Sequence, residues 1–202
     1  MPGVAKTQKR VRDLREECVR EAFAVVGEVG VAGLSIREVA RRLGVSHQAP
    51  YKHFASSDAL LAEIVRRAYE EFAEYLENRP KTGVAHKDMH SLGEAYVAYA
   101  RKHPMHYRLM FGTLLPAPEE FPETMAAARA AFGILLSAIS GVKPGGDETE
   151  AKLDALFVWA TVHGIATIQE TSVMEQLGMD AKLRKEALPH ALMRIGLAMG
   201  VG

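Results

Sequence analysis

The 202-residue chain has a single cysteine, Cys18, which excludes an intramolecular disulfide and a cysteine-based zinc site. Runs that alternate between apolar and polar residues are also missing, so no β-strand is predicted. The longest apolar stretches, residues 130–142 and 155–168, fall short of the roughly 18 to 20 residues that span a bilayer. The basic N-terminal segment has no apolar core after it and does not resemble a secretory signal. We therefore expect a cytoplasmic protein without a membrane partner.

Net charge is absent as well, because 25 Lys and Arg balance 25 Asp and Glu, which by itself argues against a nucleic-acid partner. The balance is uneven along the chain, however. Residues 1–54 carry 10 basic and 6 acidic residues, whereas residues 55–202 carry 15 basic and 19 acidic residues. The sequence thus predicts a basic N-terminal region and an acidic remainder. An N-terminal arm along a phosphate backbone is expected from five basic residues: Lys6, Lys9, Arg10, Arg12 and Arg15.

What the sequence does have is helical periodicity over nearly its whole length. The apolar fraction of 48% is that of a folded globular chain, and the length allows one large or two small domains. We predict an all-α fold of about nine helices, with Cys18 in the core and the first helix ending at Gly30. The later helices are expected near residues 35–43, 47–54, 57–78, 86–102, 104–112, 120–141, 148–174 and 180–199.

The segment from Leu34 to Phe54 contains the most informative pattern. Ser35 and Glu38 have capping-box spacing, and Gly44 suits the end of a short helix. Ser46 offers a second N-cap, so another short helix should follow through Phe54. Two short helices around a glycine turn predict a helix-turn-helix unit.

Polar and small side chains of this unit are suited to DNA. Helix N-termini and hydroxyl groups at Ser35, Ser46 and Tyr51 can donate to phosphates, while Gln48 and His47 can pair with bases. Ala49 leaves room for a thymine methyl group or the backbone. Positive potential is expected from Arg37, Arg41, Arg42, Lys52 and His53.

Residues 10–76 resemble the N-terminal domain of tetracycline-repressor-type (TetR family) transcriptional regulators. The resemblance lies in the order and spacing of LSIREVARRLGVS, APYKHF and SSDALLAEIV after a long first helix. It implies that Ser46, Tyr51, Lys52 and His53 hold phosphates, and that His47, Gln48 and Ala49 recognise bases. Family members usually have a lysine where this chain has Ser57, and Pro50 is expected to loosen the recognition helix.

The C-terminal region resembles one subgroup of that family through WATVHG, Trp159 to Gly164, and through the His-Pro segment at residues 101–112. The resemblance implies a homodimer formed by the last two long helices, and it implies a small-molecule effector. Effector contacts are expected from Tyr107, Met110, Phe111, Met125, Trp159 and His163. Trp159 and His163 are also compatible with a buried aromatic residue packed on a core histidine. Gly164 in mid-helix suggests a close helix crossing.

The sequence offers little support for an enzyme. Histidine pairs at 86 and 90 and at 103 and 106 have metal-ligand spacing, but Asp88 and Glu94 are the only carboxylates nearby in sequence. No hydrolase triad or phosphate-binding glycine loop is present in the sequence. We therefore predict no catalytic site, no metal and no cofactor, while a metal-sensing regulator and an all-α ligand-binding protein remain the alternatives.

These observations lead to one expected organisation. Residues 1–56, extended to about 78 by the connecting helix, should form the DNA-binding domain, and residues 79–202 the effector-binding and dimerisation domain. The expected function is a transcriptional regulator that binds double-stranded operator DNA. A repressor released by a small molecule is favoured over an activator.

Overall fold

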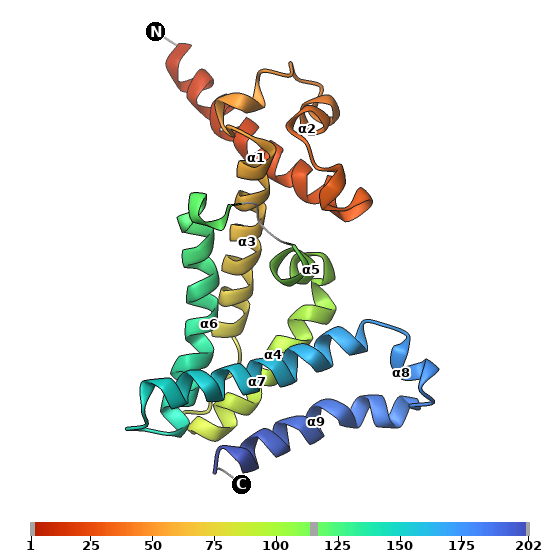
Figure 1. Cartoon of the computed structure of the whole chain (residues 1–202). Coiled ribbons are helices and arrows are strands. Elements are labelled where there is room, and N and C mark those ends of the chain that lie inside the picture. The colour runs from red at the N-terminus through yellow and green to blue at the C-terminus, as the bar shows by residue number, and fades with distance from the viewer. Residues whose placement is uncertain (1–2, 114–116, 201–202) are drawn as a thin grey trace. The chain divides into compact units, whose positions relative to one another are not determined.

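The computed structural model describes the backbone of residues 3–113 and 117–200, and the side chains from Leu14 onward in those ranges. In this part of the chain the regular elements are helices and no strand occurs, which confirms the all-α prediction. The α-helices of the described residues, labelled in Figure 1, are α1 (Gly3–Val29), α2 (Ile36–Leu43), α3 (Ser57–Glu77), α4 (Ala85–Lys102), α5 (Pro104–Gly112), α6 (Pro122–Val142), α7 (Glu148–Gln169), α8 (Val173–Gln176) and α9 (Ala181–Ala198). Short 3₁₀ helices occur at Val31–Gly33, Pro50–Lys52 and Pro118–Glu120.

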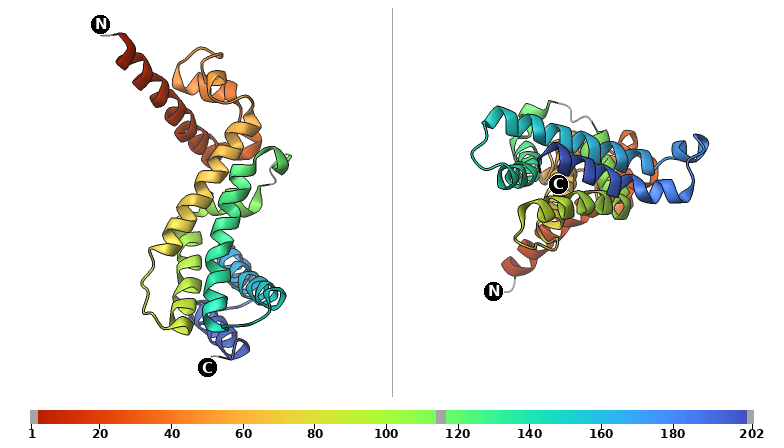
Figure 2. Two further views of the ribbon diagram at one scale, coloured as in Figure 1. Left: turned by 90° about the vertical axis from the view of Figure 1, so that its left-hand side faces the viewer. Right: turned by 90° about the horizontal axis from the view of Figure 1, so that it is seen from below.

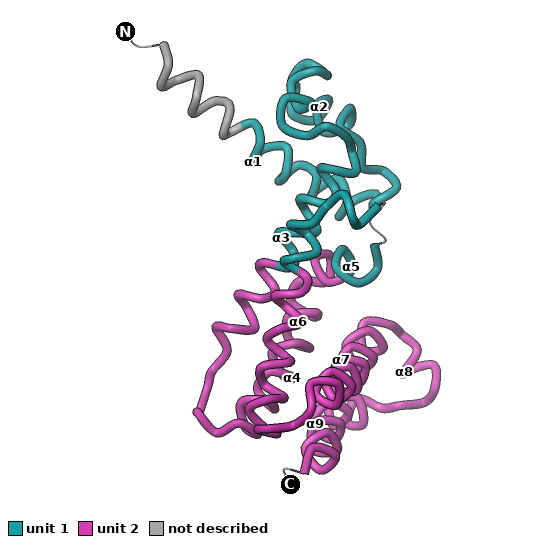
Figure 3. Tube along the Cα trace, turned by 60° about the vertical axis from the view of Figure 1, so that its left-hand side comes forward, with its two compact units in different colours: residues 1–69, 108–127 teal, residues 70–107, 128–202 magenta. Residues whose placement is uncertain are grey.

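The chain forms two compact units, shown in two colours in Figure 3. Unit 1 consists of Met1–Tyr69 and Arg108–Ala127, and unit 2 of Glu70–Tyr107 and Ala128–Gly202. Helices α3, α5 and α6 each contribute residues to both units. The units therefore divide α3 after Tyr69, within the helix.

Unit 1 is built on the packing of α1 against α2. Cys18, Ala22 and Val25 of α1 and Val39 and Ala40 of α2 are fully buried, so the predicted core position of Cys18 is confirmed. The small side chain of Ala40 allows the two helices to approach closely. Glycines end both helices as expected, because Gly30 (φ 78°) and Gly44 (φ 66°) have positive φ values that other residues rarely adopt.

Ion pairs join α1 to α3 within unit 1. The carboxylate of Glu63, which is only 8% exposed, lies 3.0 Å from Arg15 and 2.9 Å from both Arg66 and Arg67. Burial acts to raise the pKa of Glu63, but hydrogen bonds from Arg66 and Arg67 hold this pKa below its ordinary value. Arg15 also lies over the Phe54 ring, 5.3 Å from its centre. Arg15 therefore has an internal structural role, unlike its predicted place in a DNA-binding arm; the side chains of Lys6, Lys9, Arg10 and Arg12 lie outside the described part.

Unit 2 is built on α4, α7 and α9, which pack against one another; Figure 2 shows α7 and α9 side by side. The Asp147 carboxylate caps α7 by accepting hydrogen bonds from the N–H groups of Thr149 and Glu150, as the sequence predicts. The helix expected over 148–174 instead ends at Gln169. There the Thr171 hydroxyl donates to the Ile168 carbonyl, a side-chain hydrogen bond that competes with helix continuation. The separate turn α8 follows.

Helices α6 and α7 are long and apolar enough to cross a membrane by length and composition alone. This is a weak criterion, since core and interface helices of soluble proteins also meet it. Only 22% of the apolar 18-residue segment of α7 is buried by the rest of the described chain. Much of the apolar surface of α7 is thus left without cover by the rest of the described chain.

Candidate functional site

The helix-turn-helix segment begins with a capped α2. The Glu38 N–H donates to Ser35 Oγ (3.1 Å), which is one half of the predicted capping box. The Glu38 side chain does not complete the box. Its carboxylate instead accepts hydrogen bonds from Arg41 (2.7 and 2.8 Å) and Arg42 (2.8 Å). These bonds lower the pKa of Glu38 to about 2, so the carboxylate is ionised at neutral pH.

The segment after Gly44 differs from the α-helix expected over residues 47–54. Only Pro50–Lys52 form regular structure, a 3₁₀ helix, and a turn precedes it. The reason is Pro50, which is buried and has no N–H to donate to the Ser46 carbonyl. That carbonyl accepts from the Ala49 N–H at 2.9 Å instead, and the His53 N–H donates to the Pro50 carbonyl. The N-cap of this 3₁₀ helix is Ala49, not the predicted Ser46, and no side chain caps it.

Recognition side chains lie together around this turn. Gln48 lies in the turn before the 3₁₀ helix, and Tyr51 lies within the helix. Together with Arg37 and His47 they line an open hollow of about 530 Å³ in unit 1. Tyr51 is 43% exposed although it is aromatic. Four predicted DNA-binding residues therefore share one surface, and this surface has no acidic side chain in its lining.

The arginines of α2 differ in whether they form ion pairs with carboxylates of unit 1. Arg41 pairs with Glu38 (2.7 Å), and Arg42 pairs with Glu38 (2.8 Å), Glu28 (2.9 Å) and Glu21 (3.5 Å). Among the described residues, neither Arg37 nor Lys52 has an ion-pair partner, and both are exposed. The predicted positive potential of Arg41 and Arg42 is thus largely neutralised within unit 1, whereas Arg37 and Lys52 keep their full charge at the surface.

Ser57, which the resemblance marked as a departure from an expected lysine, has an internal role. Its Oγ accepts a hydrogen bond from the Ile36 N–H (3.2 Å) and so joins the start of α3 to the start of α2. Neighbouring Ser56 caps α3 by accepting from the Ala59 N–H (3.1 Å). Phe54 is 3% exposed, so its ring is packed in the interior of unit 1. His53 is half-buried, and Ala49 is half-buried beside exposed Ser46.

Unit 2 holds a polar cluster among aromatic rings. His163 Nδ1 lies 2.9 Å from Tyr96 Oη and 2.7 Å from Tyr107 Oη. Trp159 Nε1–H donates a hydrogen bond to Tyr96 Oη (3.1 Å). The Tyr96 hydroxyl can in turn donate a hydrogen bond to His163 Nδ1. Burial lowers the pKa of His163 and raises that of Tyr107, which favours the neutral form of both. The Trp159 ring also packs against Phe132.

Three of the six predicted effector residues, Tyr107, Trp159 and His163, are therefore brought together. The other three, Met110, Phe111 and Met125, belong to unit 1. There the Tyr69 hydroxyl donates to the Met110 carbonyl (2.8 Å), and the Tyr69 ring packs edge-on against Phe111. Sequence reasoning missed Tyr96, although its position on the buried face of α4, between Leu92 and Tyr99, was visible in the helical periodicity.

Two protein-family models match this chain. One, described as bacterial regulatory proteins of the tetR family, matches residues 19–64, and the other, described as a tetracyclin repressor-like C-terminal domain, matches residues 89–192. The chain belongs to the TetR family. Its N-terminal match covers the helix-turn-helix with the hollow described above, and its C-terminal match covers the Tyr96–Tyr107–His163 cluster.

Curated relatives of this TetR-family chain include mycobacterial proteins. An uncharacterized HTH-type transcriptional regulator of Mycobacterium tuberculosis, Rv0681, is 30% identical over 168 residues, which are 83% of this chain and 75% of the relative. The HTH-type transcriptional regulator Rv1816 of the same species is 30% identical over 122 residues, covering 58% of this chain and 52% of the relative.

Solved structures of similar fold agree with this placement. A regulatory protein designated SCO4313 has a TM-score of 0.72 at 24% identity, covering 92% of this chain and 98% of that one. A protein of unknown function from Rhodococcus sp. RHA1 has a TM-score of 0.71 at 27% identity, with coverages of 92% and 94%. SmeT, described as the repressor of a Stenotrophomonas maltophilia multidrug efflux pump, has a TM-score of 0.64 at 23% identity, with coverages of 91% and 89%. The chain is thus a transcriptional regulator by family and has the fold of such regulators.

Proposed function

We propose that this TetR-family regulator is a cytoplasmic, non-enzymatic homodimer that represses transcription by binding double-stranded operator DNA until a small molecule releases it. Residues 1–56, extended to about 78 by the connecting helix, supply the DNA-binding function in this proposal. Residues 79–202 supply effector binding and dimerisation. The observation that carries the proposal is the hollow of unit 1, lined by Arg37, His47, Gln48 and Tyr51.

The lining of the hollow matches the chemistry of a major groove. The Gln48 amide can pair with adenine, and the Arg37 guanidinium can bind the O6 and N7 acceptors of guanine in a bidentate manner. His47 supplies a further group for base edges, and the small Ala49 allows close approach. Because Arg37 has no carboxylate partner among the described residues, its contact with DNA breaks no internal ion pair.

Phosphate contacts are assigned to the rim of the same surface. Lys52 and Tyr51 are exposed, and Ser46 and His53 flank them in sequence. The Ser35 hydroxyl accepts from the Glu38 N–H, which leaves its own hydrogen available for a phosphate oxygen. Such contacts position a protein on DNA without selecting the sequence.

The uncovered apolar surface of α7 and α9 supports the homodimer. Leu153, Leu156 and Phe157 of α7 are 62%, 52% and 47% exposed, and Leu183 and Leu197 of α9 are 54% and 55% exposed. Among the described residues, a Cβ atom at Gly164 of α7 would meet no atom within 4 Å outside its own stretch of helix, which supports a close helix crossing between subunits at this position. A four-helix bundle formed by α7 and α9 of two chains would bury this surface.

A test of the dimer uses a charge on that surface. We expect Leu156→Glu to shift the protein from dimer to monomer in sedimentation, and to lose operator affinity with it. Lys152→Glu is the matched control, because Lys152 lies on the same helix and is already polar and exposed. A Leu156→Glu protein that stays dimeric would contradict the proposed bundle.

The Tyr96–Tyr107–His163 cluster supports an effector of mixed character. Its aromatic rings suit an apolar body, and its three hydrogen-bonding groups suit one or two polar atoms. A ligand can weaken DNA binding only by its differential affinity for two conformations of the dimer. These conformations would differ in the spacing of the two recognition segments, which must match a DNA turn of about 34 Å.

The deciding experiment is a gel shift with DNA taken from beside the regulator's own gene. We expect binding that survives competition by unrelated DNA. In the same assay Gln48→Ala should relax the preference for one DNA sequence over another. Lys52→Ala should weaken binding to all sequences and reduce the slope of log affinity against log salt concentration by about 0.9. Unchanged preference in Gln48→Ala would remove its base-recognition role, and no preferred DNA for the wild type would remove the proposal.

A further inference from the structure

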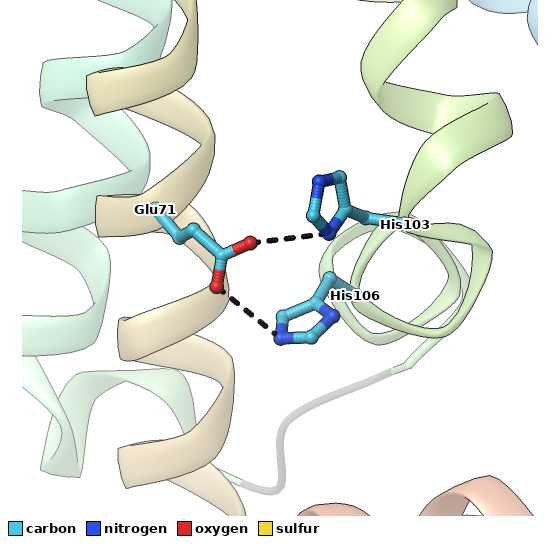
Figure 4. Close-up of side chains that lie close together, drawn as sticks. All are labelled: Glu71, His103 and His106. Carbon is cyan, nitrogen blue, oxygen red and sulfur yellow. Dashed lines mark ion pairs between the residues drawn. The ribbon is translucent and has the colours of Figure 1, made fainter.

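Unit 2 contains a second polar cluster that the proposed function does not use. It consists of Glu71, His103 and His106, whose side chains point toward one another in Figure 4. Glu71 Oε1 lies 3.3 Å from His103 Nδ1, and Glu71 Oε2 lies 3.5 Å from His106 Nε2. The three nearest donor atoms all lie within 4.8 Å of one another. The carboxylate is 32 residues from the first histidine, so the sequence around the histidines could not indicate it.

The backbone holds the two imidazoles at a sharp bend. His103 ends α4, where its N–H donates to the Tyr99 carbonyl (2.8 Å), and Pro104 starts α5 directly after it. His106 follows in the first turn of α5. The His103 ring stacks on the Tyr99 ring, with centres 4.6 Å apart and planes 21° apart. This stacking restrains the ring orientation, so His103 Nδ1 faces the Glu71 carboxylate.

The spacing of the donor atoms fits a metal ion better than a hydrogen-bonded ion pair. Charge-assisted hydrogen bonds between nitrogen and carboxylate are usually about 2.7–2.9 Å long, shorter than both distances seen here. Two ligands that lie about 2.0–2.1 Å from a tetrahedral ion are separated by roughly 3.3–3.4 Å. The 3.3 Å to Glu71 Oε1 and the 3.5 Å to Glu71 Oε2 are close to that edge length. Each distance runs to a different carboxylate oxygen, and with one ligand atom per residue the three donors lie within 4.8 Å of one another.

The surroundings also suit an ion of the first transition row. All three side chains are partly shielded, with exposed fractions of 45% for Glu71, 25% for His103 and 21% for His106. The Tyr99 hydroxyl is fully buried and makes no hydrogen bond of ordinary geometry among the described residues. The Glu71 carboxylate is the charged group that lies near it.

We propose that Glu71, His103 and His106 bind one divalent transition-metal ion of the Zn²⁺ type. Two imidazoles and one carboxylate are a ligand set that leaves at least one position open for water or another ligand. Tyr99 then acts as a positioning residue, because it stacks on one ligand and its hydroxyl can donate to the carboxylate of another. The ion would join α3 to the α4–α5 bend within unit 2.

The test uses the full-length protein after removal of metals by a chelator. Titration calorimetry with Zn²⁺ should show one ion per chain, and Co²⁺ should give visible absorption bands of a four- or five-coordinate site. Glu71→Gln keeps the size of the side chain and should weaken Zn²⁺ binding at least as much as the roughly 10- to 100-fold that loss of a supporting outer-shell partner costs. Tyr99→Phe should weaken binding less than Glu71→Gln does.

A matched control is available in the same chain. His103→Ala/His106→Ala should abolish binding, whereas His86→Ala/His90→Ala removes as many imidazoles and should leave it unchanged; His90 only pairs with Glu94 at 3.6 Å. Circular dichroism checks that each variant is folded, and Glu71→Gln decides the matter if the double variant is not. Absence of stoichiometric Zn²⁺ binding would overturn the proposal. So would unchanged binding in Glu71→Gln, or loss of binding in the His86→Ala/His90→Ala control.

Discussion

The polar groups of unit 1 that are assigned to DNA lie at the surface between Ser35 and His53. The hydrogen-bonding groups of the Tyr96–Tyr107–His163 cluster in unit 2 are more enclosed and come from distant segments of the chain. In unit 2, Tyr96 and Tyr107 meet His163 across 67 and 56 residues of chain. Side chains such as Arg37 and Gln48 can bind a partner without giving up internal bonds. The polar atoms of the Tyr96–Tyr107–His163 cluster already form hydrogen bonds with one another, so a ligand that binds to them has to replace these bonds. If the proposed function holds, unit 1 can bind DNA without breaking internal bonds, whereas a ligand in unit 2 has to displace hydrogen bonds that already exist.

The largest expected effect concerns stability. His163→Ala removes the partner of two tyrosine hydroxyls and should lower the free energy of unfolding by about 1–3 kcal/mol. Gln48→Ala, on the exposed surface of unit 1, should change this free energy by no more than about 0.5 kcal/mol. Urea unfolding followed by circular dichroism measures both. Equal losses would mean that the two units do not differ in the way described.

The next effect concerns the two kinds of arginine in unit 1. Arg37→Ala should weaken operator binding by about 1–3 kcal/mol, because it removes an unpaired cation from the hollow. Arg41→Ala should cost less, since Arg41 is already paired with Glu38. Fluorescence anisotropy with labelled operator DNA measures both affinities at one salt concentration. A larger loss in Arg41→Ala would show that ion pairing within α2 does not limit contact with phosphate.

A smaller effect is expected from releasing a paired charge. Glu38→Gln should free Arg41 but not Arg42, which keeps Glu28 and Glu21 as partners. Affinity for nonspecific DNA should rise, and the slope of log affinity against log salt should steepen by about 0.9. Glu28→Gln frees no arginine, because Arg42 keeps Glu38 and Glu21, and its slope should equal that of the wild type.

The smallest effect concerns pH. Because burial lowers the pKa of His163, the unfolded chain binds more protons than the folded chain below the ordinary histidine pKa of about 6.5. Stability should thus be fully present above that pH and fall progressively as the pH drops below it. In the presence of a chelator, His163→Gln should show a shallower dependence, with a remainder due to His106, whose pKa is also lowered. An identical pH profile in His163→Gln would contradict the assignment.

The same contrast explains what could be predicted from the sequence. Helix ends in unit 1 depend on residues close in sequence, and the predicted N-cap at Ser35 and the terminating glycines at 30 and 44 are confirmed. Only the Glu38 side chain departs from the predicted capping box, because it binds Arg41 and Arg42. The helix expected over residues 47–54 is wrong because one missing N–H group, that of Pro50, outweighs the apolar pattern. The placement of charges also escaped the sequence, since Glu21, Glu28 and Glu38 converge on Arg42 only after α1 and α2 have packed.

The sites of unit 2 escaped prediction for a different reason. Periodicity tells which face of a helix is buried but not which residue of another helix lies opposite. Trp159 and His163 were found because they are four residues apart on one helix. Tyr96 and Glu71 could be placed only when α3, α4 and α7 were seen together, since their partners lie 32 to 67 residues away.

The buried position of Cys18 has a practical consequence. Burial raises the pKa of its thiol, and the side chain has no exposed surface, so thiol reagents can reach it only when unit 1 opens. The rate at which a thiol reagent modifies Cys18 therefore measures opening of unit 1. This rate can be compared with and without operator DNA. While unit 1 is folded, the Cys18 thiol does not react. A cysteine introduced at the surface would then be the one site that takes a thiol-reactive label, and Cys18 would not have to be replaced.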